Sequence, residues 1–110
     1  MKVPNAERAA VDIAKLRDYS LSPAHEEGKH KARVFAAALG LAEGDADWLR
    51  SVLLDAVRRY GCELGRKTPF GQGYIVDFPV TRADKRAQVR SVWNVRPIEN
   101  VPRLVTCYVL

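Results

Sequence analysis

The stretch DADWLRSVLLDAVRRYGCELGRKTPFGQGYIVDFPV, residues 45–80, contains the change of hydrophobic periodicity that decides the fold. In its first half, apolar side chains recur every three or four residues, and Gly61 follows them at the position where helices commonly end. From Cys62 onward, apolar residues alternate with polar ones, as they do in strands. The chain therefore changes from helix to strand at Gly61. The helical stripe comprises Leu49, Val52, Leu53, Ala56, Val57 and Tyr60, after an expected N-cap at Asp45.

Two more helices are expected on the N-terminal side of this stretch. The first begins after Asp12, a residue type that caps helix N-termini, and extends to Tyr19 or Ser20. The second follows Gly28 and ends at Gly40, with an apolar face formed by Ala32, Phe35, Ala36 and Leu39. Residues 1–10 are expected to form a lead-in that lies against the domain.

On the C-terminal side, four strands are expected, over residues 62–67, 74–80, 87–96 and 103–109. They are joined by a turn over 68–73, a hairpin tip at Ala83–Lys85 and a loop over 97–102. Because these connections are short, an antiparallel meander is favoured. We therefore predict one α+β domain, residues 1–110, in which about three N-terminal helices pack on one face of a roughly four-stranded antiparallel sheet.

The third strand is expected to separate an apolar face from a polar one. Trp93 shares a face with Val89 and Val95, so we expect it in the core. The opposite face carries Gln88, Arg90, Asn94 and Arg96, next to Thr106 and Tyr108 of the last strand. An open, basic face with an aromatic side chain is suited to binding RNA.

The charge balance is basic, with 18 Lys and Arg against 13 Asp and Glu and a formal net charge of +5. Basicity is typical of nucleic-acid-binding domains, although a solvated surface alone also explains an excess of this size. The longest apolar run, residues 34–42, is too short and too interrupted by glycine to span a bilayer, and residues 1–10 contain no apolar signal-peptide region. We expect no membrane partner and a cytoplasmic location.

No metal, cofactor or hydrolase motif is recognisable. Cys62 and Cys107 lack the spacing of zinc ligands and are expected to be buried free thiols. The two glycines of FGQGY, residues 70–74, fit a hairpin rather than a phosphate-binding loop. The acidic residues are scattered, so hydrolysis by two carboxylates has little support. We therefore expect neither a metal nor a cofactor.

The segment SPAHEEGKHKARVFAAAL, residues 22–39, is the strongest candidate for chemistry. Where a Pro-containing loop turns into a helix, it brings together His25, His30, Lys29, Lys31 and Arg33. Such residues suit metal-free RNA cleavage, in which the 2′-hydroxyl loses a proton, the leaving 5′-oxygen gains one and cations stabilise the transition state. The alternative for His25 is an exposed or capping histidine, and helical spacing sends His30 to the far side.

Several motifs resemble one family of small, mostly uncharacterised bacterial domains. They are PNAE (4–7), SPAH and GKHKARVF (22–35), TPFGQGY (68–74), VWN (92–94) and PRLVTCY (102–108), in the same order over nearly the whole chain. Members of this family resemble stand-alone toxins and the C-terminal toxin domains of contact-dependent and polymorphic toxins. These domains in turn resemble the ribonuclease superfamily of barnase, EndoU, the tRNA-cleaving colicins and RelE-type toxins.

The resemblance implies metal-independent cleavage of tRNA or other structured RNA, with neutralisation by an acidic antitoxin or immunity protein. Carried onto this chain, it implies His25 as acid or base, Lys31 and Arg103 as phosphate ligands, and Thr106 or Tyr108 as orienting groups. Further RNA contacts are expected from Lys29, His30, Arg33, Arg90, Asn94 and Arg96. Two positions depart from the family pattern, because Gly73 stands in place of a common lysine and Val109 in place of a common proline.

One geometric question and two alternative functions remain open from the sequence. On a regular strand, Arg103 and Thr106 point to opposite faces, so either a bulge intervenes or only one of them belongs to the site. A non-enzymatic module could use the same polar face to bind RNA or a protein. A structural domain could have a basic face that is only solvated.

Overall fold

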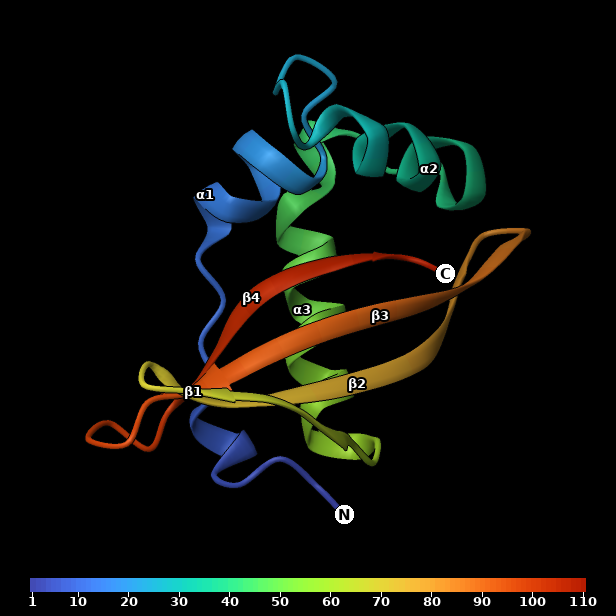
Figure 1. Ribbon diagram of the computed structural model, residues 1–110. Helices are drawn as coiled ribbons and strands as arrows, with labels where there is room; N and C mark the ends of the chain where they lie inside the picture. The colour runs from blue at the N-terminus through green and yellow to red at the C-terminus, as the bar shows by residue number, and fades with distance from the viewer.

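Four antiparallel strands form one sheet in the order β1–β2–β3–β4 in the computed structural model, which describes residues 1–110 (Figure 1). The strands are β1 (Glu63–Thr68), β2 (Gly71–Arg82), β3 (Lys85–Val95) and β4 (Pro102–Val109). Each strand pairs with the next one along the chain. The predicted α+β fold, with helices before an antiparallel meander, is confirmed.

Strand β2 is longer than the sequence pattern indicated, and the turn before it is shorter. It begins at Gly71 rather than Tyr74, so only Pro69 and Phe70 connect β1 to β2. Gly71 has φ +136°, and a Cβ atom there would lie 2.3 Å from the Val95 carbonyl oxygen. Because any larger residue would clash, glycine is what allows the start of β2 to lie this close to the end of β3, where Gln72 pairs with Val95.

Three helical regions precede the sheet, as predicted. The first comprises α1 (Ile13–Lys15) and a π-helical turn, η2 (Leu16–Ser20), and Asp12 caps it by accepting a 3.0 Å hydrogen bond from the Ala14 N–H. The others are α2 (Lys29–Leu39), which ends at Gly40, and α3 (Ala46–Arg59). Two short 3-10 turns are η1 (Ala6–Arg8) and η3 (Glu43–Asp45). None of these helices is long and apolar enough to cross a membrane.

Asp45 precedes α3 as predicted, but its side chain does not cap that helix. Its carboxylate accepts hydrogen bonds from the Ala42 N–H at 2.9 Å and from the Arg82 guanidinium at 3.0 Å. The same guanidinium donates to the Gly40 carbonyl at 3.0 Å. Asp45 and Arg82 therefore join the end of α2, the start of α3 and the end of β2.

Helix α3 lies across one face of the sheet, and the core fills the space between them (Figure 1). The fully buried side chains of this core include Phe35, Leu49, Leu53, Val76, Phe78, Val89 and Trp93. The Trp93 Nε1–H donates to Ser91 Oγ at 2.9 Å, and that hydroxyl donates to the Val76 carbonyl at 2.9 Å. The core position predicted for Trp93 is confirmed, and its one polar atom is satisfied.

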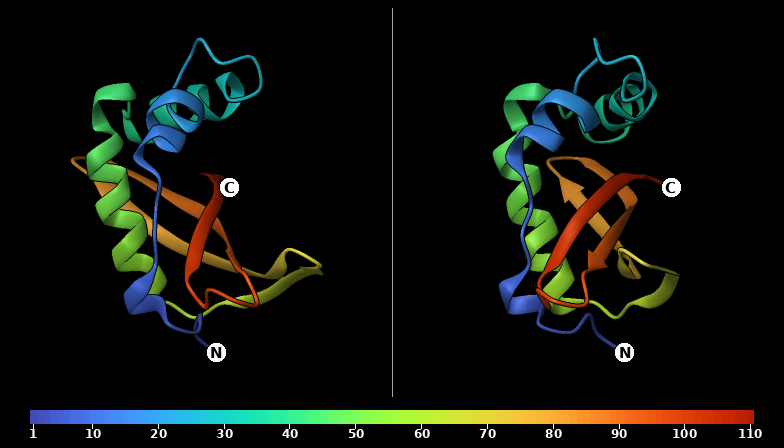
Figure 2. Two further views of the ribbon diagram at one scale, coloured as in Figure 1. Left: turned by 90° about the vertical axis from the view of Figure 1, so that its left-hand side faces the viewer. Right: turned by 60° about the vertical axis from the view of Figure 1, so that its left-hand side comes forward.

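The N-terminal half of the chain covers the outer edge of β4. Ala10 pairs in parallel with Arg103, and the Ala10 carbonyl accepts from the Leu104 N–H at 3.1 Å. Farther along β4, residues 13–20 and α2 pack beside the strand (Figure 2). The opposite edge of the sheet, β1, has no neighbouring strand. Residues from both halves of the chain therefore meet at the β4 edge.

The two cysteines differ in burial. Cys107 is fully buried, whereas Cys62 is only partly buried, so the expectation of a buried thiol is wrong for Cys62. Burial raises the pKa of the Cys107 thiol to about 12, although the neighbouring Ser20 hydroxyl acts in the opposite direction. Burial also raises the pKa of Cys62 above its ordinary value.

We expect the free energy of unfolding to decrease as the pH rises from 9 to about 12, because Cys107 keeps its proton when folded but ionises near 9.0 when unfolded. The unfolded chain then binds fewer protons, so stability that is present below pH 9 is lost. The loss from this thiol is about 4 kcal/mol at most. Denaturant unfolding at several alkaline pH values measures it. Cys107→Ala should make the unfolding free energy depend less steeply on pH than Cys62→Ala does. An equal pH dependence in the two variants would contradict the assignment of this loss to Cys107.

Candidate functional site

A β-bulge at Val105 brings three predicted site residues to one face of the sheet. The extra residue shifts the alternation of side chains along β4, so Leu104 and Cys107 are both buried. The residues on the opposite face are Arg103, Thr106 and Tyr108, whose partners on β3 are Asn94, Val92 and Arg90. The bulge therefore resolves the conflict of strand parity between Arg103 and Thr106.

Lys31 reaches from α2 to this face of β4. Its Nζ donates to Thr106 Oγ1 at 2.9 Å and lies 5.2 Å from the Tyr19 ring centre and 5.6 Å from that of Tyr108. No carboxylate forms an ion pair with Lys31. Two aromatic faces and a hydroxyl hold the ammonium group in place without neutralising it, so its charge remains available for an anion.

His25 contacts the same Tyr19 ring as Lys31 does, and it fixes the turn that leads into α2. Its ring meets the Tyr19 ring edge-on, with centroids 4.6 Å apart. The Nδ1 atom accepts hydrogen bonds from the Glu27 and Gly28 N–H groups, both at 3.0 Å. Because Nδ1 is an acceptor, the neutral ring carries its proton on Nε2, which these two hydrogen bonds leave free. We call His25, Lys31, Thr106, Tyr19 and Tyr108 the Lys31 site.

Tyr19 and Lys15 belong to this region but were not predicted from the sequence as site residues. Lys15 Nζ lies 3.4 Å from the carbonyl oxygens of both Leu104 and Val105, at the bulge. A surface pocket of about 500 Å³ is lined by Lys15, Tyr19 and His25. The i, i+4 spacing of Lys15 and Tyr19 was the available signal, because it places two side chains on one side of a helix.

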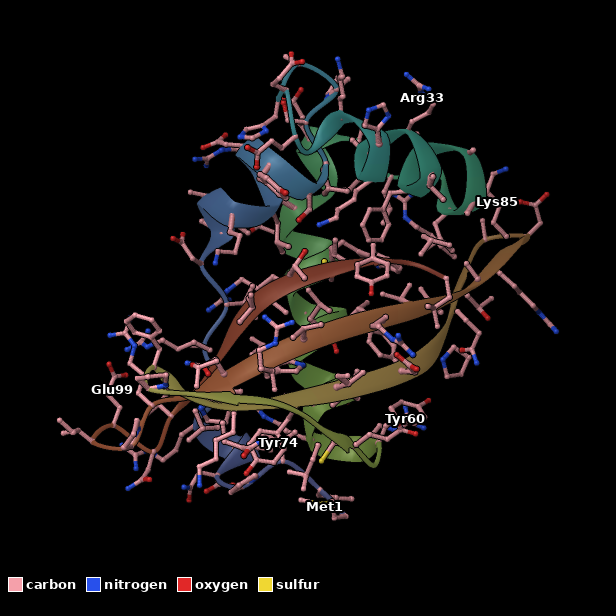
Figure 3. All side chains as sticks on the ribbon, viewed as in Figure 1. Met1, Arg33, Tyr60, Tyr74, Lys85 and Glu99 are labelled. Carbon is pink, nitrogen blue, oxygen red and sulfur yellow. The ribbon has the colours of Figure 1, made fainter.

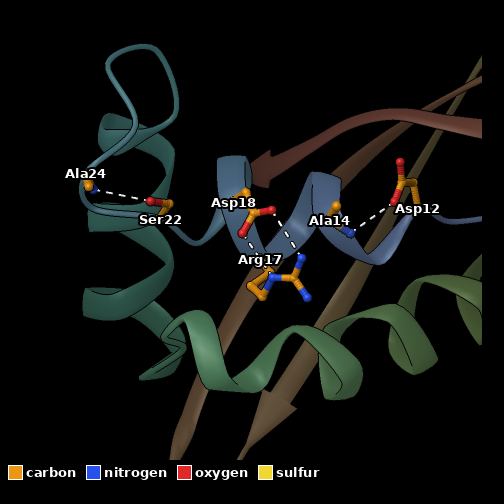
Figure 4. A network of polar contacts seen from close by, with 6 residues as sticks. All are labelled: Asp12, Ala14, Arg17, Asp18, Ser22 and Ala24. Carbon is orange, nitrogen blue, oxygen red and sulfur yellow. Dashed lines mark hydrogen bonds and ion pairs between the residues drawn. The ribbon is translucent and has the colours of Figure 1, made fainter.

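Local polar contacts fix the segment that leads into α2 (Figure 4). They are the Asp12 cap on Ala14, an exposed ion pair between Arg17 and Asp18 at 2.9 Å, and a 3.3 Å hydrogen bond from the Ala24 N–H to Ser22 Oγ. The ion pair lowers the pKa of Asp18, and its exposure limits what it contributes to stability. The Asp12 and Ser22 side chains define where the backbone turns before α1 and after η2.

Four other predicted cations are paired with carboxylates. Arg90 binds Asp77 through two hydrogen bonds of 2.8 Å, which lower the pKa of Asp77. Lys29 contacts the exposed Glu26 at 3.5 Å. Arg96 and Arg103 both contact Glu99. The polar face of the sheet therefore presents ion pairs more than free positive charges.

The remaining predicted residues lie apart from one another. Arg33 points outward from α2 (Figure 3) and lines a groove of about 440 Å³ that includes Leu21. His30 is exposed and lines a separate pocket together with Lys31 and Tyr108. Asn94 donates to the Phe70 carbonyl at 3.1 Å. No three His, Cys, Asp or Glu side chains gather into a set that could hold a metal ion.

The fold and site together define a basic α+β domain with a cationic, histidine-containing cluster at its sheet edge. The same fold occurs in a chain of a contact-dependent growth inhibition toxin–immunity protein complex from Klebsiella pneumoniae 342, with a TM-score of 0.68 and 15% sequence identity over 94% of this chain and 95% of that chain. The chain belongs to the family of domains of unknown function DUF6883, whose model matches residues 2–110. No curated protein matches the sequence.

Proposed function

We propose that this domain is a metal-independent ribonuclease toxin that cleaves tRNA or other structured RNA in the cytosol. The observation that carries the proposal is the Lys31 ammonium, which is bonded to the Thr106 hydroxyl, paired with no carboxylate, and in contact with the Tyr19 ring that His25 also contacts. The fold shared with a chain of a toxin–immunity complex supports the toxin assignment. The net charge of +5 supports a polyanionic substrate.

The reaction needs groups that this site can supply without a metal. The 2′-oxygen attacks its own phosphorus, the bond from phosphorus to the 5′-oxygen breaks, and a 2′,3′-cyclic phosphate and a 5′-hydroxyl result. Lys31 would stabilise the charge that develops on the phosphoryl oxygens, and the Thr106 hydroxyl would orient the same group. Tyr19 and Tyr108 would keep Lys31 in place.

His25 would transfer the proton through Nε2. Its Nδ1 is held by the backbone N–H groups of Glu27 and Gly28, so Nε2 is the ring atom that can reach substrate. In the neutral tautomer Nε2 carries a hydrogen and can donate a hydrogen bond to a phosphoryl oxygen or to the leaving 5′-oxygen. Giving a proton to the 5′-oxygen requires the imidazolium, and taking the 2′ proton requires an Nε2 without its hydrogen; both forms carry a proton on Nδ1. Either transfer would therefore require the ring to release the Glu27 and Gly28 N–H groups first.

The basic charge also favours an acidic partner. A cognate antitoxin or immunity protein with a negative surface would be attracted by the same field that attracts RNA. Covering Lys31 with one of its carboxylates would remove the free charge on which cleavage depends. We expect such a protein to protect cells from the toxin.

The direct test is expression of the wild-type chain in bacteria, with sequencing of RNA ends and incubation of purified protein with tRNA in EDTA. We expect growth arrest and new ends that bear 2′,3′-cyclic phosphate and 5′-hydroxyl groups. Intact RNA both in cells and in the tube would disprove the proposal. Binding without cleavage would instead support the alternative, a non-enzymatic RNA- or protein-binding module.

Two substitutions of His25 separate its chemical role from its structural one. We expect His25→Asn to keep the turn before α2, because a side-chain amide oxygen can accept the same backbone N–H groups, but to lower cleavage by about 100-fold. His25→Ala should lose a similar share of cleavage and, in addition, about 1 kcal/mol of unfolding free energy. Rates on tRNA and denaturant unfolding measure the two effects. If His25→Asn cleaves as fast as wild type, fixing the turn before α2 is the only role of this residue.

A further inference from the structure

Two arginines, Arg96 directly after β3 and Arg103 in β4, converge on one carboxylate beyond the Lys31 site. Arg103 donates to Glu99 Oε2 from Nε at 2.9 Å and from Nη2 at 2.8 Å, and Arg96 donates to Glu99 Oε1 from Nη1 at 3.3 Å. The Glu99 side chain is 31% exposed, less than either arginine. Figure 3 shows Glu99 at the loop end of the sheet, far from Arg33 on α2.

The loop that carries Glu99 is braced rather than free. The Asn100 N–H donates to the Arg96 carbonyl at 3.2 Å, and the Asn5 side chain donates to the Asn100 carbonyl at 3.0 Å. Asn100 has φ +57°, a left-handed conformation that asparagine tolerates better than most residues. The chain therefore places this carboxylate between the two guanidinium groups by a defined turn.

The space beside the arginines connects them to the Lys31 site. A surface pocket of about 470 Å³ is lined by Lys15, Asn94, Arg96 and Arg103. Lys15 and Val105 also line the pocket that contains His25, so the two pockets adjoin along the β4 edge. Asp12, which lines both as well, is already engaged as a helix cap. Lys15 is paired with no carboxylate and lies between the two cationic groups.

We propose that Arg96 and Arg103 form a second phosphate-binding subsite for the RNA strand held at the Lys31 site, and that Glu99 occupies this subsite in the free protein. The inference rests on the proposed function. Guanidinium N–H groups donate to carboxylate and to phosphate oxygens alike, and the two arginines together contact both oxygens of Glu99, so Glu99 takes the place of a phosphate group. A single-stranded RNA that reaches this far displaces Glu99, and Lys15 contacts the strand between the two subsites.

The test measures RNA binding in a chain whose cleavage is removed by Lys31→Met. We expect Glu99→Gln in this background to bind a short single-stranded RNA oligonucleotide about three- to tenfold more tightly at low salt. The slope of log affinity against log salt concentration should become steeper by about one, because an additional phosphate contact releases a counterion. Fluorescence anisotropy across a salt series measures both quantities.

Two controls separate a subsite from a general charge effect. Glu63→Gln removes the same charge from β1, at the far edge of the sheet, and should leave affinity nearly unchanged. Adding Arg103→Met to Glu99→Gln should abolish the gain in affinity, because the guanidinium group that the first substitution makes available to phosphate is then absent. An unchanged affinity in Glu99→Gln, or a gain that survives Arg103→Met, would overturn the inference. A lower melting temperature without tighter binding would identify Glu99 as a loop clamp only.

The outcomes also distinguish this inference from the proposed function. If the wild-type chain cleaves no RNA but Glu99→Gln strengthens RNA binding as expected, the ribonuclease assignment fails and the subsite stands. If the wild-type chain cleaves RNA and Glu99→Gln changes neither affinity nor salt slope, the subsite fails and the ribonuclease assignment stands. Failure of the chain to bind RNA at all would reject both.

Discussion

Replacing Lys31 with methionine is expected to lower the rate of RNA cleavage by about 1,000-fold, the size of effect that follows loss of a group stabilising transition-state charge. Methionine has a similar length and packs well against aromatic rings, so it can fill the space between Tyr19 and Tyr108. Folding should therefore be retained. The measurement is the single-turnover rate on tRNA, alongside thermal unfolding of both proteins.

The matched control is Lys29→Met, two residues before Lys31 on α2. Lys29 is partly exposed and contacts Glu26, so its loss removes the same formal charge without touching the Lys31 site. We expect it to change cleavage by less than about threefold, as loss of a screened surface charge does. Equal losses in the two variants would mean that only the overall charge of α2 matters. A Lys31→Met protein that cleaves normally would remove Lys31 from the reaction.

The sequence predicts the architecture because periodicity is a local property. The change from a helical to an alternating pattern at Gly61 is visible without knowing any contact, and the meander follows from short connections. The alternation in β3 likewise predicts the core position of Trp93, which is confirmed. These features depend only on the order of residues along the chain, which the sequence gives directly.

The site is less predictable, because its geometry depends on register and on irregular backbone. The bulge at Val105 decides that Arg103 and Thr106 share a face, yet nothing in the sequence around Val105 distinguishes it from a regular strand. The π-helical turn that places Tyr19 against Lys31 has no sequence signature either. The ion pair between Arg90 and Asp77 can be predicted only when the register between β2 and β3 is known. Without that register, the sequence does not show whether either charge is neutralised.

A second large effect is expected from Gly28→Ala, because α2 begins in direct contact with the backbone of η2. A Cβ atom on Gly28 would lie 2.1 Å from the Tyr19 carbonyl oxygen and 2.8 Å from its carbonyl carbon. Backbone atoms cannot rotate away as a side chain can, so the helix start and η2 must separate. We expect a loss of about 3 kcal/mol in unfolding free energy, at the upper end of overpacking effects.

Cleavage should fall as well in Gly28→Ala, because the same movement carries Tyr19 and His25 away from Lys31. Gly28 has an ordinary negative φ, so the requirement for glycine comes from the missing space and not from the backbone angle. Gly44→Ala is the matched control, since a Cβ atom there meets nothing within 4 Å. That variant should be neutral or more stable by up to about 1 kcal/mol. Denaturant unfolding of both variants decides the matter, and a Gly28→Ala chain as stable as Gly44→Ala would show that η2 and α2 are not in tight contact.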